Sequence, residues 1–184
     1  MATTWFQRLF TGGVSSALQA TQAKAQAGDA EAQFSLGLKF ATGTEGEGQD
    51  YEQAAHWYRQ AAEQNHALAQ FNLAMIYLEG QGVEQDAAEA VVWFQKAAVQ
   101  GDAGAQFNLG MNHRRASLER KPTNAAESRI EAYKWFQLSA AQGYKGSAAA
   151  YEQVNLNMSR EDVAEGNHRA DTLRAAMVPA TAAA

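Results

Sequence analysis

Apolar and polar positions along this chain alternate with a helical period, and the pattern recurs. In one kind of segment, Ala and Leu stand four residues apart and a small residue follows, as in Ala69, Leu73 and Ala74. In the other kind, small and aromatic residues are spaced by three and four, as in Ala90 and Trp93. These spacings place side chains on one face of a helix. Long alternating or β-branched runs are missing, so the pattern predicts an all-helical chain.

Three short motifs recur in register. Ala-Gln-Phe occurs three times, with periods of 37 and 36 residues, starting at Ala32, Ala69 and Ala105. A Trp followed by Tyr or Phe starts at Trp57, Trp93 and Trp135. Four residues after each Trp comes a third motif, Ala-Ala-x-Gln or Ser-Ala-x-Gln. Self-similarity at such a period is typical of a repeat architecture and not of a compact enzyme.

Turns and helix caps between these segments are indicated by single residues. A Gly-rich turn, as in residues 80–83, ends the first helix of a pair, because Gly readily adopts the left-handed conformation. Asp50, Asp86 and Ser128 stand at matching N-cap positions before the second helices. We therefore expect the second helices over about residues 51–64, 87–100 and 129–142.

Together these residues resemble the Sel-one-like repeat, a relative of the tetratricopeptide repeat. The family pattern is Ala-x-x-x-Leu-Gly, an aromatic, Gly-x-Gly-Val, Asp, Ala-x-x-Trp-Tyr/Phe and Ala-Ala-x-x-Gly. The second unit, residues 69–101, fits it almost throughout, with Tyr77 as the aromatic and Ala74 in place of Gly. The third unit departs most: His113 replaces the aromatic, and a six-residue insertion over about residues 115–128 replaces Gly-x-Gly-Val.

The resemblance covers roughly residues 25–150 and implies a right-handed α-solenoid of antiparallel helix pairs, with about three full repeats and capping helices. We expect the array to occupy residues 25–158. Residues 159–184 would add a C-terminal capping helix, started by Ser159, and a frayed tail.

Residues 1–24 are expected to form an N-terminal helical cap or a targeting segment. Four apolar residues there could share one side of a short helix: Trp5, Phe6, Leu9 and Phe10. This stripe could cover the end of the array or touch a membrane surface. A cleaved signal peptide is the third interpretation, although Thr, Ser and Gly dilute its apolar stretch.

Composition excludes several kinds of site. The 184 residues include no Cys, so the chain has no disulfide, thiolate zinc site or cysteine nucleophile. A formal net charge of −5 argues against a nucleic-acid binder, which usually carries a basic stripe. No apolar run approaches the roughly 18 residues of a membrane-spanning helix. We predict a cytoplasmic protein, with a periplasmic or membrane-peripheral location as the alternative, and the resemblance implies a bacterial origin.

Candidate catalytic and metal-binding residues are few. No two histidines lie three or four residues apart, and we interpret each as an isolated surface side chain: His56, His66, His113 and His168. The Gly-rich turns lack the Gly-Lys-Ser/Thr ending of a phosphate loop, and no nucleophile motif appears. The sequence therefore predicts no catalytic residue, no metal and no cofactor.

Equivalent positions of the first helices form the main candidate for partner binding. First helices of such solenoids usually line the concave face, where repeated Asn and Gln could hydrogen-bond a peptide backbone. The alternative is that some of these amides bond between neighbouring repeats and hold the array together. The candidate residues are Gln33, Ser35, Lys39, Gln70, Asn72, Ile76, Gln106, Asn108 and Asn112.

A weaker candidate is the basic insertion of the third unit. It places four cations close together in an acidic protein: Arg114, Arg115, Arg120 and Lys121. Such a cluster could receive an acidic partner segment. The alternative is a solvated loop.

The resemblance thus implies a non-enzymatic adaptor that acts as a monomer and binds a peptide or helix of a partner protein on its concave face. One alternative is a membrane-peripheral scaffold anchored by the N-terminal aromatic residues. The other is an enzyme that binds or hydrolyses β-lactams, as do some cysteine-rich secreted relatives, whose regular cysteines are missing here.

Overall fold

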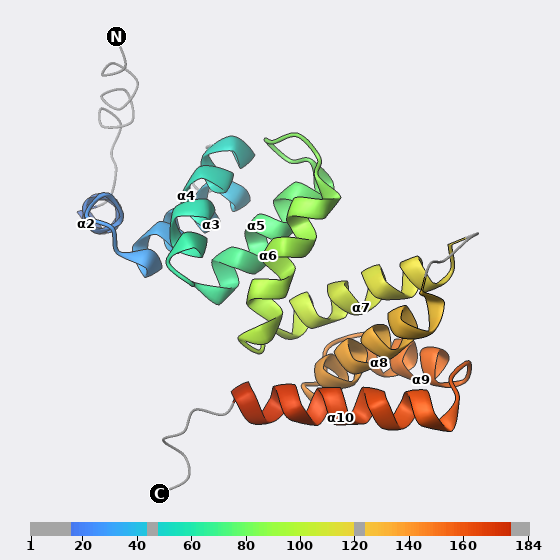
Figure 1. Cartoon of the computed structure of the whole chain (residues 1–184). Coiled ribbons are helices and arrows are strands. Elements are labelled where there is room, and N and C mark those ends of the chain that lie inside the picture. The colour runs from blue at the N-terminus through green and yellow to red at the C-terminus, as the bar shows by residue number, and fades with distance from the viewer. Residues whose placement is uncertain (1–15, 44–47, 120–123, 178–184) are drawn as a thin grey trace, which may run out of the picture.

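The computed structural model describes residues 16–43, 48–119 and 124–177, and within these ranges every regular element is a helix (Figure 1). The α-solenoid expected from the sequence is confirmed. The helices are α2 (Ser16–Gln26), α3 (Ala30–Thr42), α4 (Tyr51–Glu63), α5 (Ala67–Glu79), α6 (Ala87–Val99), α7 (Ala103–Ser117), α8 (Ala125–Ala141), α9 (Ser147–Asn155) and α10 (Arg160–Met177).

Three helix pairs form the repeats: α3 with α4, α5 with α6, and α7 with α8. Each helix from α2 to α8 contacts the next helix along the chain, so the core grows by stacking neighbours (Figure 1). At one end α2 packs on α3, and at the other α9 and α10 both pack on α8. Residues 1–15, which include the apolar stripe from Trp5 to Phe10, lie outside the described ranges. Within the described helices, none is both long and apolar enough to span a membrane.

Two of the three predicted caps of the second helices are confirmed. The Asp50 carboxylate accepts a hydrogen bond from the backbone N–H of Gln53 at 3.0 Å, and Asp86 caps α6 in the same way. Ser128 is not a cap, because α8 begins at Ala125 and not at residue 129. Good helix formers and an acidic first turn precede Ser128, so the helix extends toward the N-terminus.

The six-residue insertion of the third unit lengthens helices and not the loop between them. Helix α7 has 15 residues where α5 has 13, and α8 has 17 where α6 has 13. In α5, Gly80 adopts the left-handed conformation, with φ +69°, and ends the helix. Ala116 stands at the equivalent position of α7, so the helix continues to Ser117.

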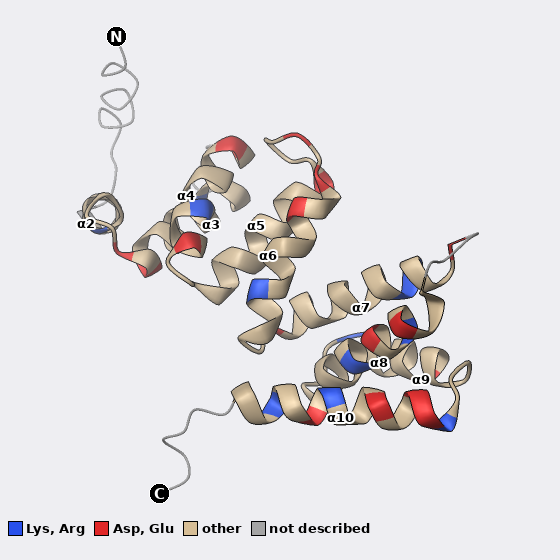
Figure 2. Cartoon of the chain, in the orientation of Figure 1, with Lys and Arg blue, Asp and Glu red and all other residues tan. Residues whose placement is uncertain are grey.

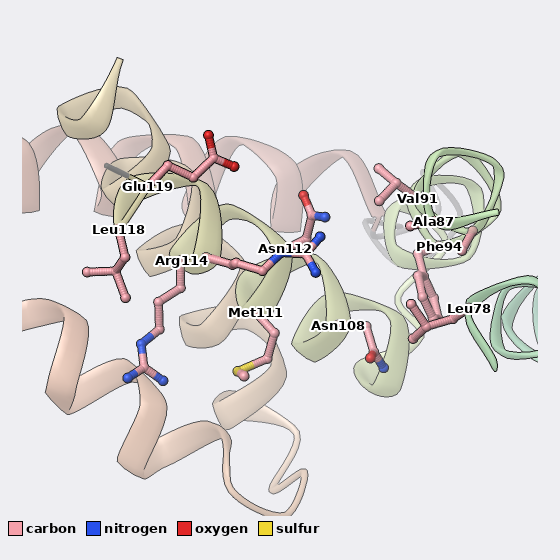
Figure 3. Close-up of a pocket in the computed structure, with 12 residues that line it drawn as sticks. Leu78, Ala87, Val91, Phe94, Asn108, Met111, Asn112, Arg114, Leu118 and Glu119 are labelled. Atoms are coloured by element: carbon pink, nitrogen blue, oxygen red, sulfur yellow. The ribbon is translucent and has the colours of Figure 1, made fainter. Parts of the chain in front are cut away.

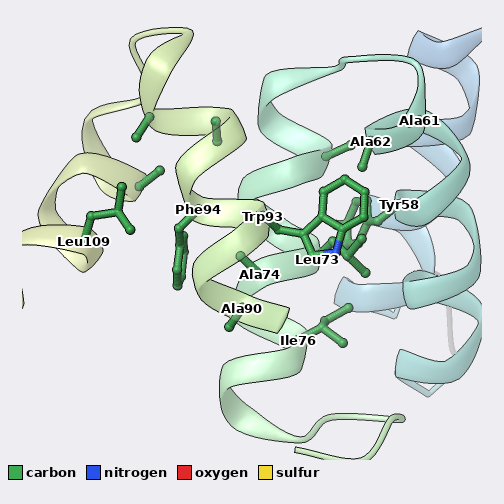
Figure 4. Packing of buried hydrophobic residues seen from close by; sticks show 14 of the residues in the cluster. Tyr58, Ala61, Ala62, Leu73, Ala74, Ile76, Ala90, Trp93, Phe94 and Leu109 are labelled. Carbon is green, nitrogen blue, oxygen red and sulfur yellow. The ribbon is translucent and has the colours of Figure 1, made fainter. Parts of the chain in front are cut away.

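The core repeats with the sequence. All three Trp side chains of the Trp-aromatic motif are buried. In each repeat the Phe of Ala-Gln-Phe lies against the aromatic residue that follows the Trp, with ring centroids 5.9, 5.9 and 5.7 Å apart. Figure 4 shows Trp93 and Phe94 among the buried side chains of the central cluster. These matching ring contacts show that the three helix pairs are equivalent units.

A small residue after the Leu of each first helix lets this ring approach the backbone. A Cβ added at Gly110 would lie 2.6 Å from the Phe136 ring, and one at Gly37 would lie 2.5 Å from the Tyr58 ring. The second repeat has Ala74 at this position and keeps its ring contact between Phe71 and Phe94. Close ring-to-backbone packing is therefore the reason for the small residue.

Ion pairs fix the last helix on the array. Figure 2 shows basic and acidic segments along both α8 and α10. Arg169 of α10 binds Glu127 and, at 2.9 Å, Glu131 of α8, and also Glu165 of its own helix at 2.7 Å. These hydrogen bonds, with that to Glu127 the strongest, raise the pKa of Arg169 above its ordinary value. Ser159 caps α10 as expected, because its hydroxyl accepts from the Asp162 N–H at 3.1 Å. The domain boundaries at residues 24 and 158 stay predictions.

Candidate functional site

The three glutamines of the first helices do not face a partner. Gln33, Gln70 and Gln106 are only 3%, 1% and 0% exposed. Each donates from Nε2 to the backbone carbonyl eight residues earlier, in the preceding helix, at 3.0–3.1 Å. Each also accepts on Oε1 from a glutamine just after the second helix of its own repeat; these donors are Gln64, Gln100 and Gln142.

Each buried glutamine therefore ties three successive helices together. Burying an amide is favourable only when its donors and acceptor are satisfied, and this arrangement satisfies them. The expectation that these three residues offer a binding surface is wrong. The alternative, that they hold the array together, is what the structure shows.

The other first-helix candidates for partner binding lie in different environments. Ile76 is 3% exposed and belongs to the main core, so it too is corrected from a surface position to a packing position. Ser35 is exposed, while Lys39 and Asn72 are half-buried. None of these four lines the pocket that Asn108 and Asn112 share.

A groove of about 540 Å³ lies between one face of α7 and the facing stripe of α6 (Figure 3). Its walls are mainly apolar, and amide and guanidinium groups enter from α7. The lining residues are Leu78, Ala87, Ala90, Val91, Phe94, Asn108, Met111, Asn112, Arg114, Arg115, Leu118 and Glu119.

The groove joins the two sites that the sequence indicated separately. Asn108 and Asn112 come from the row of first-helix positions, and Arg114 and Arg115 come from the basic insertion. All four lie on α7, so helix extension carries the start of the insertion onto the wall of the groove. The other two predicted cations, Arg120 and Lys121, lie outside the described residues.

Two features leave polar groups of the groove available. The Asn108 side chain donates from Nδ2 to the Gly104 carbonyl at 2.9 Å, which leaves its oxygen free to accept another hydrogen bond. Neither Arg114 nor Arg115 forms an ion pair or a side-chain hydrogen bond with any residue in the described part of the chain. The arrangement can therefore bind an apolar group together with hydrogen-bonding and anionic groups.

Sequence reasoning missed the apolar wall of this groove. Leu78, Val91, Phe94, Met111 and Leu118 look like ordinary core or surface residues in a helical pattern. The available signal was the departure of the third unit from the family pattern. At the place of Gly-x-Gly-Val the third unit has Ala-Ser-Leu-Glu, residues 116–119, and the last two of these line the groove.

The histidines differ from the expected isolated surface residues at two positions. His66 caps α5, because its Nδ1 accepts from the Ala69 N–H at 3.2 Å, and its ring stacks on Phe34 with centroids 4.7 Å apart. His113 is half-buried, and burial lowers its pKa. The exposed pair is His56 and His168. In the described ranges, no three His, Cys, Asp or Glu residues gather as a metal site would require.

Comparison with known proteins shows clear similarity. The family model described as Sel1 repeat matches residues 30–66, 67–102 and 103–144. Among solved structures, c5321, a protective antigen present in uropathogenic Escherichia coli strains and displaying an SLR fold, is 31% identical with a TM-score of 0.67. The match covers 85% of this chain but 34% of c5321, so the chain spans about a third of that protein's length.

A second similar structure is the Sel1 repeat protein from Oxalobacter formigenes. It is 30% identical with a TM-score of 0.62, and the match covers 74% of this chain and 97% of that one. No curated protein sequence matched.

Proposed function

Because this chain belongs to the Sel1 repeat family, whose members are generally protein–protein interaction modules, we propose that it is an adaptor that holds a peptide or helix of a partner protein in the groove between α6 and α7. Proteins of this family are typically non-catalytic repeat scaffolds. The proposal places binding at one junction of the array and not along the whole row of first-helix positions.

The observation that carries the proposal is an apolar groove with unsatisfied polar groups on its wall. Its volume of about 540 Å³ lies in the usual range for ligand sites, about 300–1,000 Å³. Met111 is 41% exposed and Leu118 is 73% exposed. Exposed apolar side chains gathered beside polar ones are typical of an interaction surface.

Site-specific photo-crosslinking in the native host tests this function. A photoreactive residue at Met111 lies in the groove, whereas one at Leu156, which is 84% exposed and outside the groove, is the matched control. We expect a partner protein to crosslink through position 111 only, and the crosslink to disappear when the bulky side chain of Asn112→Trp obstructs the groove. Capture of the same proteins from both positions would contradict the proposal.

A further inference from the structure

We infer that the segment held in the groove is a short acidic peptide with one large apolar side chain, and that Arg114 and Arg115 pair with its carboxylates. This inference rests on the proposed function and adds the chemistry of the partner. Three observations support it: the unpaired charges, the apolar wall between Phe94 and Met111, and the length of the groove.

The charges around the groove favour an anion. The chain has a net charge of −5, and several of its cations are already engaged: Lys134 binds Glu131, and Arg169 binds three glutamates. Arg114 and Arg115 are consecutive, lie near the end of α7 (Figure 2) and have no such partner in the described ranges. A single carboxylate, Glu119, also lines the groove and pairs with neither arginine.

Two consecutive arginines without an ion-pair partner in the described ranges make this end of the groove positive, which attracts an acidic segment. Guanidinium also matches the geometry of a carboxylate and forms paired hydrogen bonds with it. Charge complementarity therefore selects an acidic occupant over a basic or neutral one.

The apolar part of the groove lies at the other end of the same face. Phe94 and Leu78 face Met111 across it, with Asn108 beside them (Figure 3). Methionine adapts its shape to different apolar groups and contacts aromatic rings favourably. One large apolar side chain of a peptide can enter here, while the oxygen of Asn108 and the amide of Asn112 face its backbone.

The length of the groove sets the length of the recognised segment. From Asn108 to Leu118 the helix rises about 15 Å, at about 1.5 Å per residue. An extended peptide covers that distance with about four or five residues. The inference therefore predicts a short motif, with its apolar residue toward Asn108 and its acidic residues toward Leu118.

Selection from a displayed library of random short peptides tests this chemistry on the full chain. Wild-type protein is the bait, and Asn112→Trp, whose bulky side chain obstructs the groove, removes peptides that bind elsewhere. We expect the enriched peptides to combine acidic residues with one large apolar residue. Their affinity should fall about tenfold or more in Arg115→Glu and should weaken with added salt.

The matched control is Arg160→Glu, the same charge change at an exposed position outside the groove. It should bind the selected peptides as wild type does, and circular dichroism should show equal helicity in all variants. Enriched peptides without acidic residues, or undiminished binding in Arg115→Glu, would overturn the inference, and so would a selection that enriches nothing.

Two further outcomes separate this inference from related ideas. If a chain without residues 1–15 selects acidic peptides and the full chain selects none, the groove is occupied by the chain's own N-terminus, and the inference of a partner is wrong. If crosslinking from position 111 finds a partner whose contacting segment is basic or neutral, the adaptor function stands and the acidic specificity falls.

Discussion

Two successive junctions of the array use the same positions in different ways. At the α4–α5 junction, Tyr51 and Ile76 pack into the core. Thirty-six residues later, at the α6–α7 junction, the equivalent positions are Ala87 and Asn112, and both line the groove. One junction is closed by apolar side chains, and the other is open because smaller and polar residues replace them.

The turn after the first helix makes the same contrast. In the closed junction, Gly82 lies so near the start of α4 that an added Cβ would come within 2.4 Å of the Tyr51 and Glu52 backbone. Its equivalent in the third unit is Leu118, which is exposed on the wall of the groove. Among the described residues, a turn covers the first junction, whereas at the second junction the extended helix places Leu118 on the wall of the groove.

The aromatic residue that follows the Trp also differs between the two junctions, because Tyr58 has a hydroxyl group and Phe94 has none. Burial raises the pKa of Tyr58 to about 12, and a hydrogen bond with Asn72 partly opposes this shift. Phe94, the equivalent residue, has no hydroxyl, and Asn108 bonds to its own helix instead. The buried ring of Tyr58 or Phe94 is thus kept at both junctions. The array can therefore lose apolar contacts at the edge of one junction and still hold together. A binding surface can be made in this way at the cost of little stability.

The largest expected effect comes from exchanging the residue types of two equivalent positions, Ile76 of the closed junction and Asn112 of the groove. Ile76→Asn should destabilise the protein by about 3–5 kcal/mol, because it removes a buried aliphatic group and buries an amide without partners. The reverse exchange, Asn112→Ile, should change stability by about 0.5 kcal/mol or less, as is usual away from the core. Denaturant unfolding measures both, and equal losses would break the distinction between closed and open junctions.

The turn gives the next largest effect. Gly82→Ala should cost about 2–4 kcal/mol, because φ is +67° there and the new Cβ would meet the backbone of α4. Leu118→Ala, at the equivalent position, should cost no more than about 0.5 kcal/mol. Thermal unfolding of the two variants compares them, and a mild Gly82→Ala variant would mean that the turn does not seal the junction.

A smaller effect is expected where the ring meets the first helix. Gly110→Ala should cost about 1–3 kcal/mol, since the Phe136 ring must move away from the added methyl group. The second repeat already has Ala74 at this position, so Ala74→Gly should cost about 1 kcal/mol through helix propensity alone. Unfolding by urea tests the pair. Stabilisation by Gly110→Ala would show that the ring contact is looser than the structure indicates.

The smallest effect should be the same at both junctions. Gln100→Ala and Gln142→Ala each remove the hydrogen bond to a buried glutamine, Gln70 or Gln106, and should each cost about 1 kcal/mol. The second hydrogen bond that Gln142 donates, to the Gly101 carbonyl, is exposed and should add little to its loss. Gln95→Ala, at an exposed residue of α6, is the control and should be neutral. If the two variants lose clearly different amounts of stability in chemical denaturation, the hydrogen bond to the buried glutamine accounts for part of the difference between the junctions.

Helices, repeats and most caps could be predicted from the sequence because they depend on local spacing. The roles of the glutamines could not, because Gln70 and the Gln100 that satisfies it are 30 residues apart and meet only in the folded array. Position within the helix pattern alone does not say whether an amide faces solvent or a neighbouring helix.

The groove was indicated in part. Asn108, Asn112, Arg114 and Arg115 were singled out, but as two separate sites, because the insertion was expected to form a loop. Its first residues instead continue α7, since no glycine ends the helix there. Departures from a repeat pattern are therefore the places to look for a binding site, even when the local structure they adopt is not evident.

Cysteine accessibility tests the contrast between the junctions most directly, because the chain has no Cys of its own. Single variants Ile76→Cys and Asn112→Cys are treated with a neutral thiol reagent under native conditions, with Leu156→Cys as the exposed reference. We predict that position 112 reacts nearly as fast as position 156, and that position 76 reacts about a hundredfold more slowly, because it must wait for the array to open. Equal rates at positions 76 and 112 would contradict the account.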